Sequence, residues 1–242
     1  MTQSPSLQRT NQRFYDALWS RSQLIDPSRF NTWTTVEALA ADRPRRLEVA
    51  PGMRPRLPVQ GTRFADISGP ALSALATAGG QATRASVTAL PFADRSFDLI
   101  AVLDVIEHVE DDAAAVGEVS RLLAAGGKVL MSVPLYQANW TQFDELVGHR
   151  RRYDPDQLRS LLAGAGLHVE RSAVYGMKPK ASWLVDFGMW HLKHTPRLAM
   201  WWYNRVFMPM GLKRQAPLRF VDGLIEDPAI DELILVCAPV GT

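Results

Sequence analysis

The stretch Arg46-Leu-Glu-Val-Ala-Pro-Gly-Met-Arg-Pro55 decides how the rest of the chain is interpreted. It begins as a short apolar strand that contains a carboxylate, Glu48, and continues into a turn. The small residues of that turn, Ala50 and Gly52, would let a ligand approach the backbone closely. A strand, an acid and a small-residue turn in this order are typical of the first strand of a nucleotide-binding sheet.

Two later strands also end in acids. Asp66 closes the run Thr62-Arg-Phe-Ala-Asp66, and Asp104 closes Ser96-Phe-Asp-Leu-Ile-Ala-Val-Leu-Asp104, which is nearly all apolar, as parallel strands buried on both faces are. Because parallel sheets hold their ligands at the carboxyl ends of the strands, we expect these acids at one edge. Asp66 suits the hydroxyl groups of a ribose; the alternative is a turn or helix-capping residue.

Three stretches carry a family resemblance: Ala89-Leu-Pro-Phe-Ala-Asp-Arg-Ser-Phe-Asp98, Asp104-Val-Ile-Glu-His-Val109 and Leu122-Leu-Ala-Ala-Gly-Gly-Lys-Val-Leu-Met-Ser-Val-Pro134. As a set they resemble the class I S-adenosylmethionine-dependent methyltransferases. Within them the chain is most similar to the type 11 group, which includes ubiquinone and menaquinone biosynthesis enzymes. The resemblance covers roughly residues 45 to 167 and the last strand.

The resemblance implies an α/β fold, a doubly wound and Rossmann-like sheet of seven mostly parallel strands in the order 3-2-1-4-5-7-6. The last strand would be antiparallel, and helices would cover both faces. It also implies S-adenosylmethionine as cofactor and a methyl transfer to a small, fairly apolar molecule. The cofactor-binding residues would be Glu48, Ala50, Gly52, Asp66, Ile67, Ser86, Val87 and Asp104.

The chain departs from the family pattern at the cofactor site. Ala50 and Arg54 stand where the family has glycines, and Ser86 stands where it usually has an aspartate. Three prolines in residues 51–58 predict that no ordinary helix follows the first strand. Two alternatives therefore stay open: a partner or binding protein with altered or lost cofactor binding, and a cofactor-bound protein with non-methylating chemistry. The absence of G-x-G-x-x-G argues against a nicotinamide dehydrogenase.

Two histidines are candidate catalytic bases for a hydroxyl or amine acceptor. His108 follows the fourth strand and has a pKa range suited to proton transfer. His149 lies in Gly148-His-Arg-Arg-Arg-Tyr153, a segment recurrent in this group of methyltransferases, and Arg152 of the same segment is a candidate substrate-binding residue. The alternatives are a histidine held structurally in its loop and arginines paired with nearby acids or helix caps.

Two segments fall outside the common sheet. Residues 1–40 are predicted to form a helical lid in which Tyr15 and Trp19 contact the substrate, unless both aromatics only pack onto the sheet. Residues 175–226 form an aromatic-rich insertion before the last strand. This insertion could line an apolar acceptor site, contact a partner chain, make a peripheral membrane contact or pack as two local helices.

Composition narrows the class of protein. The 242 residues suit a single methyltransferase-like domain, and 47% hydrophobic residues allow a full core. A net charge of +2 gives no reason to expect nucleic acid. One cysteine, Cys237, excludes a disulfide framework, and the histidines lack metal-ligand spacing, so no metal is expected. No apolar run is long enough to span a membrane and the polar N-terminus lacks the apolar core of a signal peptide, so we expect a cytoplasmic protein. The sequence leaves open whether it is a monomer or a homodimer.

Overall fold

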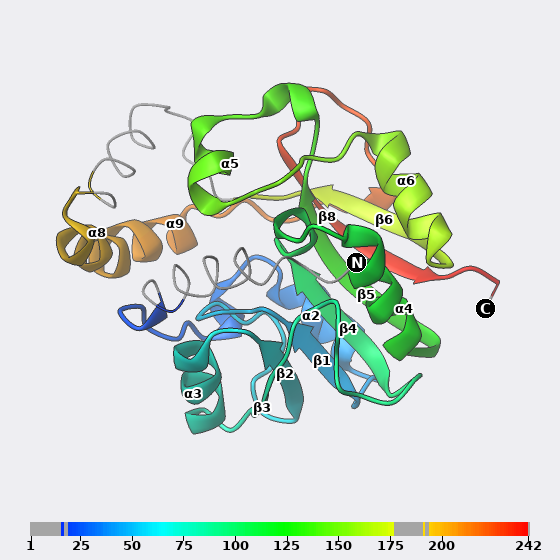
Figure 1. The fold of residues 1–242 in the computed structure, drawn as a ribbon, viewed down its shortest axis with the longest axis horizontal. Coiled ribbons are helices and arrows are strands. Elements are labelled where there is room, and N and C mark those ends of the chain that lie inside the picture. Colours follow the sequence, from blue (N-terminus) through cyan, green and yellow to red (C-terminus); the bar gives the residue numbers. More distant parts are fainter. Residues whose placement is uncertain (1–15, 17–18, 177–190, 192–193, 242) are drawn as a thin grey trace.

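The computed structural model describes residue 16, residues 19–176, residue 191 and residues 194–241. Eight strands form one sheet in the order β3-β2-β1-β4-β5-β8-β6-β7 (Figure 1). The strands are β1 (Arg46–Val49), β2 (Thr62–Asp66), β3 (Gln81–Arg84), β4 (Phe97–Leu103), β5 (Leu123–Pro134), β6 (Leu167–Val174), β7 (Val221–Asp222) and β8 (Glu232–Pro239). The first five pair in parallel, whereas β8 runs antiparallel to β5 and β6.

The predicted Rossmann-like order is confirmed, with one addition. The short strand β7 pairs with β6 through Arg171 and Ser172 at the edge of the sheet. The last strand of the prediction, expected over residues 232–239, is therefore β8 here, and its bounds match the structure.

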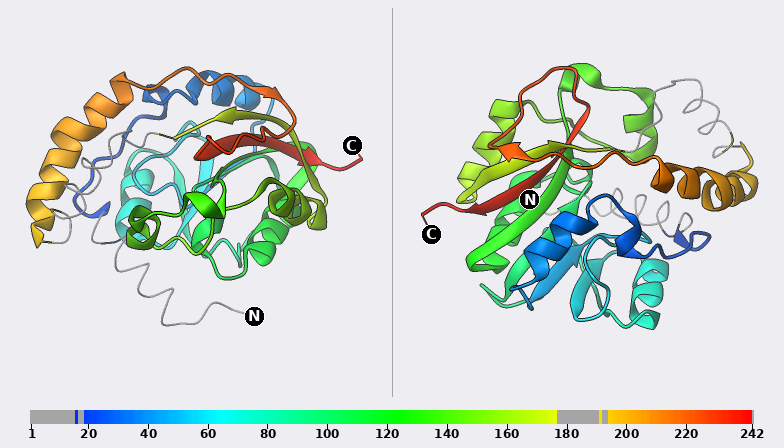
Figure 2. Two further views of the ribbon diagram at one scale, coloured as in Figure 1. Left: turned by 90° about the horizontal axis from the view of Figure 1, so that it is seen from above. Right: turned by 180° about the vertical axis from the view of Figure 1, so that it is seen from behind.

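Helices cover both faces of the sheet, as Figure 2 shows from two directions. The helix α2 lies on one face, and α4 and α6 lie on the other. The α-helices are α2 (Trp33–Ala40), α3 (Gly69–Thr77), α4 (Asp112–Leu122), α5 (Gln142–Val147), α6 (Pro155–Gly164), α8 (Pro196–Trp202) and α9 (Met208–Lys213). Shorter helical turns are η1 (Pro27–Arg29), η2 (Ile106–His108), η3 (Gln137–Asn139) and the π-helical η4 (Tyr203–Phe207). Residues 50–61 contain no helix, as their prolines predicted.

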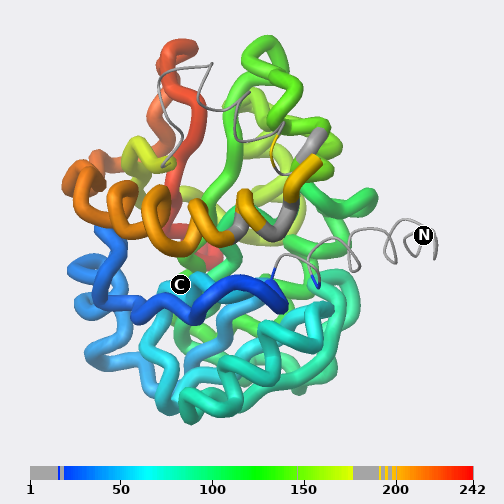
Figure 3. Tube along the Cα trace, turned by 90° about the vertical axis from the view of Figure 1, so that its left-hand side faces the viewer, coloured from blue at the N-terminus to red at the C-terminus, as the bar shows by residue number. Residues whose placement is uncertain are grey.

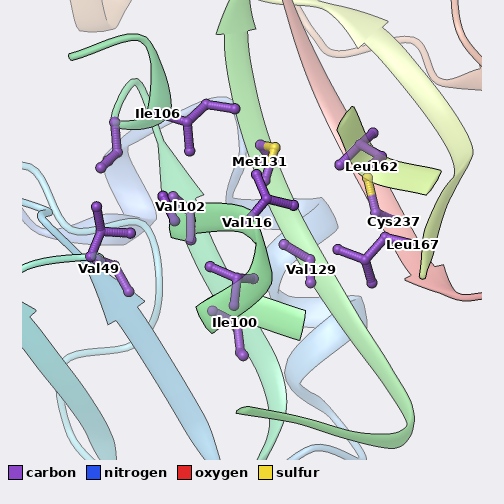
Figure 4. Packing of buried hydrophobic residues seen from close by; sticks show 14 of the residues in the cluster. Val49, Ile100, Val102, Ile106, Val116, Val129, Met131, Leu162, Leu167 and Cys237 are labelled. Atoms are coloured by element: carbon purple, nitrogen blue, oxygen red, sulfur yellow. The ribbon is translucent and has the colours of Figure 1, made fainter. Parts of the chain in front are cut away.

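The apolar core explains why the sequences of the central strands are almost continuously apolar. Leu99 and Ala101 of β4 pack toward Val36 of α2, while Ile100 and Val102 pack on the opposite face. Figure 4 shows this second cluster, in which the β4 side chains meet residues of α4, β5 and α6. Alternate residues of one strand are thus buried on opposite faces of the sheet.

The strand register places the predicted site at the carboxyl ends of the parallel strands. Val49 of β1 lies opposite Ala65 of β2 and Val102 of β4. The turn after β1, Asp66 at the end of β2 and Asp104 after β4 therefore lie side by side at the carboxyl ends of parallel strands. The sequence analysis predicted this grouping of the acids that end the strands.

Several local expectations differ from the structure. The sequence pattern predicts a third strand over residues 82–87, whereas β3 ends at Arg84, because Ser86 and Ala89 form a tight bridge. It predicts a fifth strand over residues 128–134, whereas β5 starts at Leu123, because Leu123 already pairs with β4 ahead of a register shift. Residues 1–15, 17 and 18 of the predicted N-terminal lid lie outside the described residues, and its described part contains η1 and α2. In the part of the chain that the structure describes, no helix has the length and apolar character needed to cross a membrane.

Candidate functional site

A buried carboxylate joins the ends of β1 and β2. Asp66 is only 4% exposed, and its Oδ2 accepts a hydrogen bond from the backbone N–H of Gly52 at 3.0 Å. Its Oδ1 accepts from the N–H of Ser68 at 2.8 Å, at the start of α3. Burial raises the pKa of Asp66, while the N–H groups of Ser68, Gly52 and Ile67 oppose that shift. Each oxygen keeps a further lone pair, so the carboxylate can still accept a bond from a ribose hydroxyl.

Glu48 holds the loop that follows β1. Its carboxylate is 1% exposed and accepts N–H bonds from Arg56 at 2.8 and 3.0 Å and from Leu57 at 2.9 Å. Burial raises its pKa to about 7 in spite of these bonds. In this structure Glu48 ties the 50–57 loop to β1, and its contact with a cofactor stays a prediction.

The turn after β1 has a left-handed backbone at two positions. Ala50 has φ +51° and Gly52 has φ +56°. The N–H of Ala50 bonds to Ala65 O at 2.7 Å, which holds the turn against β2. A left-handed conformation is unusual for alanine and easy for glycine, so the structure adopts at Ala50 the backbone that the family glycine would favour.

Trp19 lies directly over this turn. A Cβ built on Gly52 would come within 2.4 Å of the Trp19 ring, and the ring is only 8% exposed. The guanidinium of Arg54 lies 5.2 Å from the Trp19 ring centre and 5.5 Å from that of Tyr203. The predicted lid residue therefore covers the turn, although whether it contacts a substrate stays a prediction. The other lid candidate, Tyr15, lies outside the described residues.

Two buried polar atoms lie beside Asp66 without hydrogen-bond partners among the described residues. They are the hydroxyl of Ser68 and Oδ1 of Asp16. The charge of Asp16 also acts to raise the pKa of Asp66. Unsatisfied buried polar atoms are expensive, and they fit a site that a polar ligand completes. The sequence pattern singles out neither Ser68 nor Asp16 as a ligand contact; Ser68 precedes a proline at the start of α3, where a serine is expected as a helix cap.

The predicted adenine-binding residues follow β3. The Ser86 hydroxyl lies 3.0 Å from that of Thr88, and Val87 is 6% exposed. The N–H of Ala85 bonds to Asp66 O at 3.1 Å, which keeps this turn next to the ribose candidate. Ser86 and Val87 thus lie beside Asp66, at the carboxyl ends of the neighbouring strands β3 and β2.

Asp104 lies at the end of β4 with φ +54° and is exposed. The hydroxyl of Ser132 on β5 donates to its Oδ1 at 2.6 Å and accepts from its backbone N–H at 2.9 Å. These two bonds hold the backbone that leads into η2, where Glu107 and His108 are found.

The two predicted bases lie together, although they come from different loops. The rings of His108 and His149 contact edge to face with centres 4.7 Å apart. Burial lowers the pKa of His108 to about 4, and the charge of His149 acts in the same direction. His149 Nδ1 lies 2.8 Å from Asp144 Oδ1, which favours a proton on Nδ1 and a lone pair on Nε2.

A fully buried acid completes this cluster. Glu107 is 0% exposed, and neither carboxylate oxygen has a hydrogen-bond partner among the described residues. Burial raises its pKa well above the ordinary value, and the charges of Asp104 and Asp144 act in the same direction. Its Oε1 lies 3.8 Å from His149 Nε2. Sequence reasoning missed Glu107; its place beside His108 after a buried strand was the available signal.

Three of these side chains could hold a metal ion. One ligand atom each from Glu107, His108 and His149 lie within 4.8 Å of one another. Sequence spacing predicted no metal because the histidines are far apart along the chain, whereas folding brings them together. The expectation that no metal binds therefore stays a prediction.

Arg152 is enclosed by ion pairs. Its guanidinium bonds to both oxygens of Asp144 at 3.0 Å, to Leu135 O at 3.2 Å and to the carboxylate of Asp231. Its side chain is 0% exposed. These contacts agree with the alternative in which the arginines of residues 148–153 pair with nearby acids. The substrate contact predicted for Arg152 would require its ion pairs to open.

The sheet order, the turn after β1 and the acid after β2 form the arrangement in which doubly wound α/β sheets hold nucleotide cofactors. Residues 62–131 match the family model described as "Methyltransferase domain". Two relatives from strains of Mycobacterium tuberculosis, each called a "Probable S-adenosylmethionine-dependent methyltransferase", are 32% identical over 117 residues. The match covers 48% of this chain and 36% of each relative, so it spans about a third of their length.

Solved structures agree on the fold. A "possible histamine N-methyltransferase" from Thermotoga maritima has a TM-score of 0.58 at 14% identity, covering 87% of this chain and 88% of that one. The cyclase SpnF has a TM-score of 0.56 at 17% identity, covering 86% and 81%. Residues 62–131 are thus similar to a methyltransferase domain, and the solved structures share the fold of the whole sheet.

Replacing Gly52 with alanine should destabilise the protein. The new Cβ would overlap the Trp19 ring at a left-handed backbone position, so we expect a loss of about 2 to 4 kcal/mol in the free energy of unfolding. Urea unfolding measures it. The matched control is Gly117→Ala in α4, where nothing lies within 4 Å and a gain of about 0.5 to 1 kcal/mol is expected. Equal stability of the Gly52→Ala protein and wild type would contradict the contact.

Removing the charge of Asp144 should also be costly. Burial alone would raise the pKa of Asp144, but bonds from Arg152 and Thr141 outweigh it and hold the pKa well below its ordinary 3.8. Because a lowered carboxyl pKa stabilises the fold above the unfolded value, the contribution is full at pH 7 and is lost as the pH falls below that value. We expect Asp144→Asn to lose about 3 to 5 kcal/mol at neutral pH.

Urea unfolding at several pH values measures this loss. The control is Asp98→Asn, which breaks an exposed pair with Arg45 and should have a much smaller effect. Similar losses in the two variants would show that the Asp144 network is not the anchor of this loop.

Proposed function

We propose that this chain is an S-adenosylmethionine-dependent methyltransferase that acts on a small, fairly apolar molecule. The observation that carries the proposal is the Asp66 carboxylate, bonded to Gly52 N–H between the ends of two parallel strands. The methyltransferase-domain match over residues 62–131 supports the choice of cofactor. The resemblance to quinone-biosynthesis enzymes supports the apolar acceptor.

The residues around Asp66 fit the parts of the cofactor. Asp66 would accept bonds from the ribose hydroxyls, with Ser68 adding a hydroxyl that lacks a partner among the described residues. Ser86 and Val87 would contact the adenine, and the turn at Ala50 and Gly52 would approach the methionine end. The cofactor supplies a methyl group on a positively charged sulfur, which an attacking nucleophile can take up directly.

The histidine cluster would act on an acceptor that carries a proton. His108 is neutral at pH 7, because burial lowers its pKa to about 4. Asp144 orients His149 through Nδ1, so that Nε2 can accept a proton from a hydroxyl or amine. Glu107, at 3.8 Å from that nitrogen, can share the proton. A carbon nucleophile that carries no proton to be removed would not need these groups as a base.

A second candidate is a protein of this fold with altered or lost cofactor binding. The specific observation that favours it is the Trp19 ring lying against Gly52, where the cofactor would approach. Alanine at position 50 and serine at position 86 favour it as well. A non-methylating reaction also stays open, since one of the structural relatives is called a cyclase.

Calorimetric titration separates these candidates. We expect the wild-type protein to bind S-adenosylhomocysteine in the micromolar range, and Asp66→Asn to weaken binding at least about tenfold, because it removes the charge that holds the ribose. Asp42→Asn, an exposed acid in the α2–β1 connection, is the control and should bind as wild type does. Absence of binding at millimolar ligand by a folded wild-type protein would contradict the enzyme proposal.

A further inference from the structure

Exposed apolar side chains gather on one helical segment. Among the described residues, eight large hydrophobic side chains are exposed, and five of them lie on α8, η4 and α9. These five are Leu198 at 47%, Trp201 at 53%, Trp202 at 45%, Phe207 at 41% and Met210 at 39% exposure. We call them the aromatic face. A concentration of this kind marks an interaction surface rather than ordinary surface scatter.

The same segment is strongly basic. Between Asp186 and Asp222 the sequence has no acid and six basic residues: Lys193, Arg197, Arg205, Lys213, Arg214 and Arg219. The last four of these are exposed in the structure. Because the whole chain has a net charge of only +2, this positive charge is a local property of the segment.

The helical segment is held to the body of the protein by its other side. Met208 is buried, and the Asn204 side chain donates to Arg21 O at 2.7 Å. Gln215, just after α9, bonds to Arg29 O at 3.1 Å and accepts from Asn31 N at 2.9 Å. Figure 3 shows the helix running beside the N-terminal segment at the outside of the molecule. The aromatic face is thus presented outward on an attached helix.

We propose that the aromatic face docks on an anionic lipid surface. Tryptophan rings suit the boundary between lipid head groups and acyl chains, while arginine and lysine reach the lipid phosphates. Each exposed cation near such a surface strengthens binding roughly fivefold. A second copy of this chain would bring two basic, acid-free faces together and repel. A nucleic acid would satisfy the cations and leave Leu198 and Met210 without an apolar partner.

Docking would also place the candidate site near lipid. Tyr203 of η4 lies 5.5 Å from the guanidinium of Arg54, which belongs to the turn after β1. A docked helix would therefore hold the turn, and Trp19 over it, next to the membrane surface. The docking proposal does not depend on the proposed function, because it rests only on the helical segment.

Vesicle flotation tests the proposal with the full chain. We expect wild type to float with vesicles of phosphatidylglycerol and phosphatidylcholine in equal parts, to float poorly with phosphatidylcholine alone, and to lose binding at high salt. The double variant Trp201→Ser/Trp202→Ser and the double variant Lys213→Glu/Arg214→Glu should each weaken partitioning at least about tenfold. All four positions are exposed, so the fold should persist.

Matched controls lie elsewhere on the surface. Val174→Ser/Val240→Ser removes two exposed apolar side chains, and Arg63→Glu/Arg84→Glu reverses two exposed cations on β2 and β3. Both controls should bind vesicles as wild type does. Folded wild-type protein that ignores anionic vesicles would overturn the proposal, as would aromatic-face variants that bind normally.

Two further measurements identify the other occupants. Sedimentation that shows a dimer abolished by Trp201→Ser/Trp202→Ser, without vesicle binding, would assign the aromatic face to a second copy and overturn the proposal. Tight binding of a single-stranded oligonucleotide, without vesicle binding, would overturn it in favour of nucleic acid.

Discussion

The hydrogen bond from Gly52 N–H to the Asp66 carboxylate is the interaction on which the candidate site depends. It joins the turn after β1 to the end of β2, and the second Asp66 oxygen extends the link to α3. A buried carboxylate stays ionised at low cost only with such partners, so the turn and the acid stabilise each other. The Glu48 carboxylate of β1 also holds the 50–57 loop, because it accepts hydrogen bonds from the backbone N–H groups of Arg56 and Leu57.

A second buried network positions the chemistry. Asp144 accepts bonds from the Arg152 guanidinium and contacts His149, which fixes a loop that is remote in sequence against η2. Glu107 and His108 are brought to His149 as a result, and their pKa values shift because they are buried there.

Sequence reasoning located the strands that end in acids, because buried parallel strands have an unmistakable apolar pattern. It also named His108 and His149 individually. Their contact could not be predicted, since it depends on how the α5–α6 loop folds around Asp144. The Trp19 ring over Gly52 was equally hidden, because only the three-dimensional structure shows that the N-terminal segment crosses the turn. The edge strand β7 is two residues long and has no pattern to detect.

A crystal structure of the protein with S-adenosylhomocysteine would show directly whether Asp66 binds the ribose. We expect ribose hydroxyls within hydrogen-bonding distance of the Asp66 carboxylate, with the Trp19 ring moved away from Gly52 to admit the ligand. A ligand bound elsewhere, with Trp19 still against Gly52 and Asp66 contacting only backbone N–H groups, would contradict it.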